Sequence, residues 1–516
     1  MFALPHCRVR LPAWPASLRL LLWAGAVLLL AAGLGAAPQT LFRSVADYGV
    51  KGDGAAAETA LIQGAIDACA VDGGCTLHFP AGRYVTGTLY FRDNVTLYLD
   101  AGAVIATSGS ADDYTAPALF YGKGVNGITL TGEGEIQAGP VPAPDETTVR
   151  NPGSRLISLV LIENATNVRI SGIRFLRSPV WTVTLRVVDG AWLENLLIEN
   201  AMLASSTNGV VLDSSTRVSV RSLVYRGGGD GITMQTSLVD GIAPPCTGIA
   251  ISDSNLRSGA TAIKVGTATH GDIRNVVVSN TVIESSQGGV GIFARDGGSV
   301  ESLQFSNLVI ETSAVRRGSA EWPIVIDLKR RDEGSQAGSV SGVAFTGVRV
   351  HTAGKLLFSG RTRHPIRELS IDGMAVTVRP AAGAPAKLER PWKSPWDAVA
   401  GEDEATTAIL LGYVADAFVR DLRVSWEGES GSPDSHALFV HSVDGLSLDG
   451  ITARQGKVGG TLAAMHFLAS RNIGIRNSTA PPETGVWVQA QGIGKQDFYL
   501  FGNNTAAAYR DYLFVR

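Results

Sequence analysis

Two aspartates and two cations in the middle of the chain have the side chains best suited to chemistry. They are Asp230, Asp296, Lys264 and Arg295. Two carboxyl groups with a substrate and a water between them could carry out acid and base catalysis. Lys264 and Arg295 could bind a carboxylate of the substrate, Arg295 through a bidentate fork. We therefore predict Asp230 and Asp296 as catalytic residues and the two cations as binding residues.

Four further side chains are candidates for substrate binding. Thr207 and Asn208 precede Asp230 by about one repeat, and His270 lies in the loop after Lys264. Trp181 lies one repeat earlier and could stack on a flat ligand face. Each candidate also has a purely structural interpretation. Aspartates in turns often accept backbone N–H bonds, and a tryptophan in an apolar strand often belongs to the core.

A short phrase that recurs along the chain must position these side chains. It begins with a small polar residue or a turn residue and continues with alternating apolar residues, which is typical of a strand. Most neighbouring copies lie roughly 25 to 40 residues apart, the range of solenoid repeats. Copies begin at Asn94, Asn126, Asn167, Arg217, Asn275, Val300, Asp444 and Asn472. The pattern predicts an all-β fold, a parallel coil of stacked strands around one core.

Stacking the copies predicts which side chains share a column. Neighbouring coils lie about 4.8 Å apart. One predicted column holds Thr233, Lys264 and Phe293. Asp230 and Asp296 are two coils apart, which places them about 10 Å from each other if they face the same way. A second predicted column contains Asp213, Gln235, Gly266 and Arg295.

The N-terminus and the composition limit location and partners. Arginines, an apolar run and small residues follow one another within residues 1–37, the order of a secretory signal peptide, with an uncleaved anchor as the alternative. We expect a secreted, periplasmic or extracellular protein. It would be associated with a membrane only if this N-terminal segment is not cleaved. A net charge of −3 provides no basic field for nucleic acid. In an exported chain Cys69 and Cys75 could pair.

Residues 38–516 are expected to form one β-helix domain. We expect the protein to be a monomer. Its N-terminal cap spans about 40–85 and contains a helix from about Glu58 to Cys69. Residues 135–155, 328–338 and 378–405 read as loops that leave the coil. The last segment, 485–516, is rich in aromatic residues.

The opening block and two later coils resemble known proteins. The resemblance is to glycoside hydrolase family 28, the polygalacturonases and their relatives, which are pectin-degrading right-handed parallel β-helix proteins with a pectin lyase-like fold. It implies a single-stranded right-handed β-helix with an N-terminal capping helix. The motifs that carry the resemblance are Val45–Gly49, Gly52–Gly54, Ile62–Cys69, Phe79–Tyr84, Asn94–Leu97, Ser178–Thr182 and Gly228–Ile232.

The family's catalytic pattern can be placed coil by coil. It consists of Asn-Thr-Asp, then Asp-Asp, then Gly-His-Gly, then Arg-Ile-Lys on successive coils. Of these positions only Thr207 and Asp230 match. The substituted positions hold Asn208, Gly229, Thr261, Gly291 and Phe293.

The resemblance implies hydrolysis of O-glycosidic bonds in a pectic or other uronate- or rhamnose-containing polysaccharide. An inverting glycosidase uses two carboxyl groups about 6.5–9.5 Å apart. Two alternatives stay open, a catalytically inactive carbohydrate-binding coil and a polysaccharide lyase on the same scaffold. We expect a polysaccharide or oligosaccharide as the partner, and no cofactor or metal, since no Asp-rich calcium cluster is visible.

Overall fold

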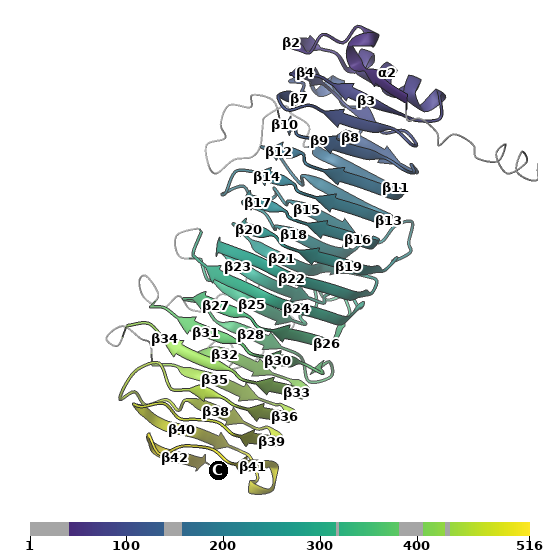
Figure 1. Cartoon of the computed structure of the whole chain (residues 1–516). Coiled ribbons are helices and arrows are strands. Elements are labelled where there is room, and N and C mark those ends of the chain that lie inside the picture. Colours follow the sequence, from purple (N-terminus) through teal and green to yellow (C-terminus); the bar gives the residue numbers. More distant parts are fainter. Residues whose placement is uncertain (1–40, 139–156, 316–318, 381–405, 429–433, 516) are drawn as a thin grey trace, which may run out of the picture. The chain divides into compact units, whose positions relative to one another are not determined.

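The computed structural model describes residues 41–138, 157–315, 319–380, 406–428 and 434–515 (Figure 1). The predicted signal segment 1–37 and most of the predicted loops 135–155 and 378–405 lie outside the described residues. The chain divides into two compact units, residues 1–42 and residues 43–516. The second unit contains the coil and every candidate site residue.

The second unit is an all-β, right-handed parallel β-helix, which confirms the predicted fold. Five strands, one from each of five successive coils, show how the coil is built. Each pairs in parallel with the corresponding strand of the next coil. They are β15 (Val210–Asp213), β18 (Ile232–Thr236), β21 (Thr261–Thr269), β23 (Gly288–Phe293) and β25 (Trp322–Asp327). Side chains that face outward from these strands therefore form columns along the coil.

The recurring phrase owes its form to a sharp turn. Asn94, Asn167 and Asn275 have φ values of 59°, 55° and 56°, in the left-handed region. Asparagine tolerates this conformation better than most residues because its short polar side chain can hydrogen-bond locally. The valine that follows each asparagine is at most 1% exposed. The turn thus directs the next strand into the core, coil after coil.

One predicted column is wrong in its last member. Lys264 pairs with Gly291, whereas Phe293 pairs with Asp327. The pairing of Thr233 with Lys264 and of Asp213 with Gln235 agrees with the prediction. A slip of two residues leaves the same side chains facing outward, so alternation alone could not detect it.

The cap helix α2 spans Thr59–Val71 and contacts β3 (Cys75–Phe79) and β5 (Leu89–Tyr90). Ile62, Ala65 and Ile66 are buried on one face of the helix, whose range agrees with the prediction to within two residues. Leu61 points away from that face and is 46% exposed. Cys69 at the end of the helix forms a disulfide with Cys75.

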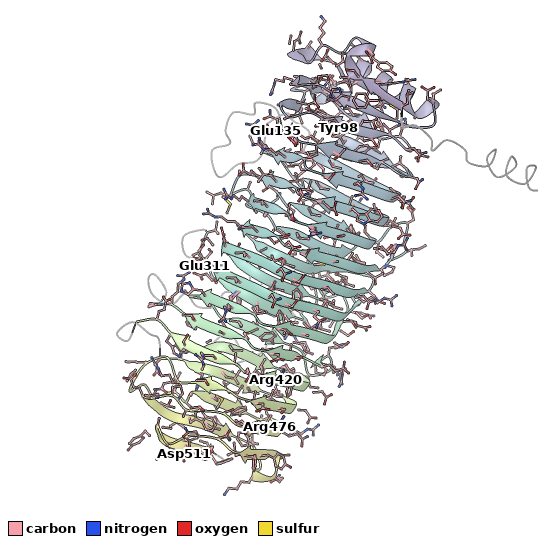
Figure 2. All side chains as sticks on the ribbon, in the orientation of Figure 1. Tyr98, Glu135, Glu311, Arg420, Arg476 and Asp511 are labelled. Carbon is pink, nitrogen blue, oxygen red and sulfur yellow. A yellow bond between two sulfur atoms is a disulfide. The ribbon has the colours of Figure 1, made fainter. Side chains whose placement is uncertain are left out.

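Charged side chains also follow the register of the coil. Four strands end in residues of opposite charge that lie side by side on successive coils. Two of these residues, Arg420 and Arg476, are labelled in Figure 2. Arg420 pairs with Asp372, and Arg476 Nε lies 3.0 Å from Asp449 Oδ2. The strands are β30 (Ser370–Asp372), β33 (Val414–Arg420), β36 (Asp444–Asp449) and β39 (Arg471–Arg476). Exposed pairs of this kind add little to stability, because solvent screens them.

The aromatic C-terminal segment is only partly packed. It contains β40 (Thr484–Gln491), β41 (Phe498–Phe501) and β42 (Ala508–Val515). Trp487 is fully buried and Phe498 is 7% exposed, whereas Tyr509 is 91% exposed. Within the described part of the chain, no helix has the length and apolarity needed to cross a membrane.

Candidate functional site

Asp230 lies in the turn between β17 (Val224–Gly227) and β18, where three donors hold its carboxylate. The backbone N–H of Thr261 donates to Oδ1 at 3.1 Å. The ammonium of Lys264 lies 2.6 Å from Oδ2, and Asn208 Nδ2 lies 3.5 Å from the same atom. The side chains of Lys264 and Asp230 are 15% and 9% exposed. The result is a largely buried, hydrogen-bonded ion pair across two coils.

Asn208 fixes the turn from the preceding coil. Its Oδ1 accepts the backbone N–H of Asp230 at 3.0 Å, and its Nδ2 lies 3.5 Å from Thr233 Oγ1. An ionised aspartate at this position could accept the same N–H but could not donate to Asp230. The amide therefore suits a position beside a carboxylate, because it donates where a second carboxylate would repel.

Tyr225 supports the site from the core. Its hydroxyl lies 2.9 Å from the carbonyl oxygen of Thr207 and 3.0 Å from that of Gly229. Burial raises the pKa of the Tyr225 phenol well above its ordinary value, so it stays a neutral donor. Thr207 itself is 1% exposed, and its hydroxyl donates to the carbonyl of Ala204 at 2.8 Å. The Thr207 hydroxyl is thus bonded within its own turn.

A pocket of about 170 Å³ lies next to Asp230. Its walls combine small residues, which open the space, with apolar and aromatic side chains. The lining residues are Asp230, Gly259, Ala260, Thr261, Gln287, Gly288, Val290, Gly291, Phe293, Trp322 and Val325. Concave, mostly apolar pockets with a few polar groups are typical ligand sites.

Asp296 lies outside this lining, in a separate ion pair. Arg331 binds both of its oxygens, from Nε at 2.7 Å and from Nη2 at 2.8 Å, and the N–H of Thr269 donates to it at 3.0 Å. Burial acts to raise the pKa of Asp296, but these hydrogen bonds outweigh it and hold the pKa below its ordinary value. Arg331 comes from the predicted loop 328–338, and its role was not predicted.

Arg295 belongs to the same neighbourhood as Asp296. Its guanidinium lies 3.6 Å from Asp327 and 5.5 Å from the centre of the Phe293 ring. Asp327 also pairs with Arg361 at 3.0 Å. Burial lowers the pKa of Arg295, and Asp327 opposes that effect. Arg295 therefore already has a carboxylate partner inside the protein.

The remaining predicted residues do not line the pocket. His270 is exposed, and its backbone N–H donates to Thr236 at 3.2 Å. Trp181 is partly buried, and its carbonyl accepts from Ser178 at 3.3 Å. The structure thus brings Asn208, Asp230 and Lys264 together and groups Asp296 and Arg295 elsewhere.

Trp322 and Gln287 line the pocket but were not predicted as site residues. Trp322 pairs with Gly288, which pairs with Thr261, so it continues the outer column that begins beside Asp230. Neither predicted column contains Thr261 or Gly288, so Trp322 could have been found only by aligning a further column through these two residues.

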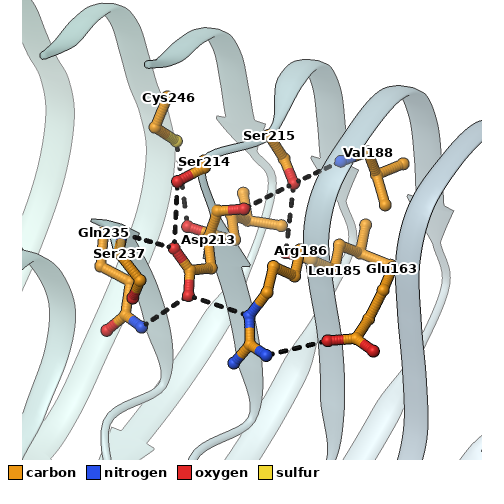
Figure 3. Close-up of polar contacts among 11 residues, drawn as sticks. Glu163, Leu185, Arg186, Val188, Asp213, Ser214, Ser215, Gln235, Ser237 and Cys246 are labelled. Atoms are coloured by element: carbon orange, nitrogen blue, oxygen red, sulfur yellow. Dashed lines mark hydrogen bonds and ion pairs between the residues drawn. The ribbon is translucent and has the colours of Figure 1, made fainter. Parts of the chain in front are cut away.

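A second polar cluster lies N-terminal to the pocket (Figure 3). Arg186 Nη1 donates to Glu163 at 2.8 Å, and its Nε donates to Asp213 at 3.3 Å. Asp213 has no exposed surface and also accepts from Gln235 and from the backbone N–H of Ser237. The acceptor sites of Asp213 are thus filled by donors from neighbouring coils. We therefore interpret this cluster as a structural link between coils.

Two histidines farther along the coil make its stability depend on pH. The rings of His436 and His466, on β35 (His436–His441) and β38 (Met465–Leu468), have centres 5.0 Å apart. Burial, with the nearby His436 charge, lowers the pKa of His466 from 6.5 to about 4. Burial also lowers the pKa of His436.

We expect the chain to lose stability as the pH falls from about 6.5 to about 4. In this pH window His466 is protonated in the unfolded state but stays neutral in the folded state. Protonation therefore favours unfolding, and the contribution of neutral His466 to the free energy of unfolding is complete only above the window. Urea unfolding across this range measures the effect. His466→Gln should flatten the slope, with His436 retaining part of it; an unchanged slope would refute the assignment.

Comparison with known proteins identifies the family of this chain. The family model described as glycosyl hydrolases family 28 matches residues 69–384, more than half of the chain. This chain belongs to family 28 of the glycosyl hydrolases. The pocket beside Asp230 lies within the matched range.

The family 28 chain has distant curated relatives. It is 24% identical over 337 residues to an exo-poly-alpha-D-galacturonosidase of Dickeya chrysanthemi, covering 52% of this chain and 55% of that protein. The family 28 chain spans little more than half the length of the curated relatives it matches.

Solved structures share the fold of the family 28 chain. An exopolygalacturonase of Thermotoga maritima is similar with a TM-score of 0.57 and 17% identity, over 66% of this chain and 88% of that one. A family 28 exopolygalacturonase of Yersinia enterocolitica gives 0.56 and 17%, over 80% and 79%.

Restoring one missing aspartate should not restore the family pattern in this chain. A Cβ at Gly229 would lie 2.5 Å from Asn208 Oδ1, 2.6 Å from Asn208 N and 2.7 Å from Thr207 C. We expect Gly229→Asp to lower stability by about 1–3 kcal/mol, as overpacking does, without raising turnover. Gly474→Asp is a matched control, because a Cβ there meets nothing within 4 Å. Thermal melts and turnover measure both; a stable, more active Gly229→Asp variant would contradict the packing argument.

Proposed function

We propose that this family 28 chain is an exported glycosidase that hydrolyses a pectic or other uronate- or rhamnose-containing polysaccharide at the pocket beside Asp230. Asp230 carries the proposal, because it is a largely buried carboxylate that lines a pocket and is held by donors from two neighbouring coils. Export is inferred from the order of residues in segment 1–37. We take the working protein to be a monomer.

In this proposal Asp230 is one of the two carboxyl groups that exchange protons with the water and the departing oxygen. Asp296, two coils further, is the predicted second one. Its ion pair with Arg331 must open before it can take part. Thr207, Asn208, His270, Arg295, Lys264 and Trp181 remain predicted binding residues.

A second candidate function is carbohydrate binding without turnover. One observation favours it: among the described residues that line the pocket, Asp230 is the only one with an ionisable side chain. Hydrolysis by acid and base needs two proton-transfer groups at the bond. Binding needs only the pocket.

Incubation of the purified chain with pectic polysaccharides separates the candidates. New reducing ends without absorbance from unsaturated products support the hydrolase, and both signals together indicate a lyase. Sedimentation of the chain with the polysaccharide, with neither signal, supports the binding coil and overturns the hydrolase.

A further inference from the structure

The charges around the pocket determine whether a charged or an uncharged sugar unit can bind there. We propose that the pocket beside Asp230 binds an uncharged sugar unit and rejects a uronate. The inference deepens the proposed function and rests on it for the assumption that the ligand is a glycan.

The cation that pairs with Asp230 is already neutralised. Lys264 places its ammonium 2.6 Å from Asp230 Oδ2, and both side chains are less than one-sixth exposed. The pair contributes no net charge. A uronate that used Lys264 would have to compete with a carboxylate already in hydrogen-bond contact with it.

Two other positions, one beside a lining residue and one within the lining, supply no replacement. Arg295 rests on the Phe293 ring, and its charge faces Asp327. A Cβ at Gly291, the residue that pairs with Lys264, would lie 2.6 Å from Phe293 Cε2. The phenyl ring thus occupies the space into which a longer side chain at position 291 would extend.

A carboxylate in this pocket would therefore be unfavourable. It would lose its hydration and lie near the carboxylate of Asp230 without a free cation among the described lining residues. Burying a charge without a compensating partner is costly, and like charges at close range repel.

A neutral sugar finds suitable partners instead. Phe293, Trp322 and Val325 give an apolar wall for the C–H groups of a sugar ring. An ammonium has three N–H donors, and the bond from Lys264 to Asp230 uses one of them. Asp230 Oδ1 accepts the N–H of Thr261 and keeps capacity for a second donor. The ion pair can thus both donate to and accept from sugar hydroxyls.

Calorimetric titration with three methyl glycosides tests the proposal. Methyl α-D-galactopyranoside and methyl α-D-galactopyranosiduronate differ only at C6, and methyl α-L-rhamnopyranoside is a second neutral probe. We expect at least one neutral glycoside to bind about tenfold or more tightly than the uronate. In Asp230→Asn, which leaves the Lys264 charge uncompensated, uronate binding should strengthen about tenfold or more.

Asp189→Asn neutralises an exposed carboxylate that pairs with Arg217 and should leave the preference unchanged. The proposal is overturned if the wild-type chain binds the uronate as tightly as the neutral probes, if it binds none of them, or if Asp230→Asn keeps the wild-type preference. Binding is read without turnover, so a chain that prefers neutral glycosides but cleaves no polysaccharide contradicts the proposed function alone.

Discussion

Asp230→Asn is expected to reduce polysaccharide hydrolysis by about 10²–10⁴-fold, the usual contribution of a general acid or base. Asparagine has nearly the same shape and can still accept the N–H of Thr261, but it cannot exchange a proton with water or with the departing oxygen. The rate of appearance of reducing ends measures the effect.

Two controls make the loss interpretable. Asp189→Asn, at an exposed ion pair with Arg217, removes a carboxylate elsewhere on the coil and should hydrolyse at the wild-type rate. Circular dichroism should show that the Asp230→Asn chain is folded. Hydrolysis at the wild-type rate by the folded Asp230→Asn variant would remove Asp230 from the mechanism.

Lys264→Met is expected to lower the free energy of unfolding by about 3–5 kcal/mol, as when one partner of a buried ion pair is removed. Methionine fills similar space but leaves the Asp230 carboxylate, 9% exposed, without its ammonium. Urea unfolding measures the change.

The double variant Lys264→Met/Asp230→Asn provides the matched control. It removes both charges together, so most of the lost stability should return, and the double-mutant cycle should give a coupling energy well above additivity. If the double variant is no more stable than Lys264→Met alone, the two charges do not stabilise each other and the electrostatic account of the site is wrong.

The fold could be predicted from the sequence because its signal repeats. Each copy of the phrase specifies the same left-handed turn and the same inward apolar residue, as at Asn94, Asn167 and Asn275. Many weak local preferences that agree with one another determine a coil well. The residue-level register was harder to predict, because moving Phe293 by two positions keeps its side chain on the same face.

The site was harder to predict because its contacts depend on atoms and loops that no local pattern specifies. The ion pair of Asp230 with Lys264 was not predicted, although the predicted pairing of Thr233 with Lys264 was correct. The partner of Asp296 could not be predicted, because Arg331 reaches it from a loop 35 residues further along the chain. The contribution of Trp322 to the pocket required the register of one additional coil.

The most direct measurement is a crystal structure of the Asp230→Asn variant soaked with an oligosaccharide of alternating galacturonate and rhamnose. We predict a saccharide in the pocket with a glycosidic oxygen about 2.6–3.2 Å from the side chain of residue 230, or one water away. A saccharide bound only elsewhere on the coil, or a pocket that stays empty at saturating oligosaccharide, would contradict catalysis by Asp230.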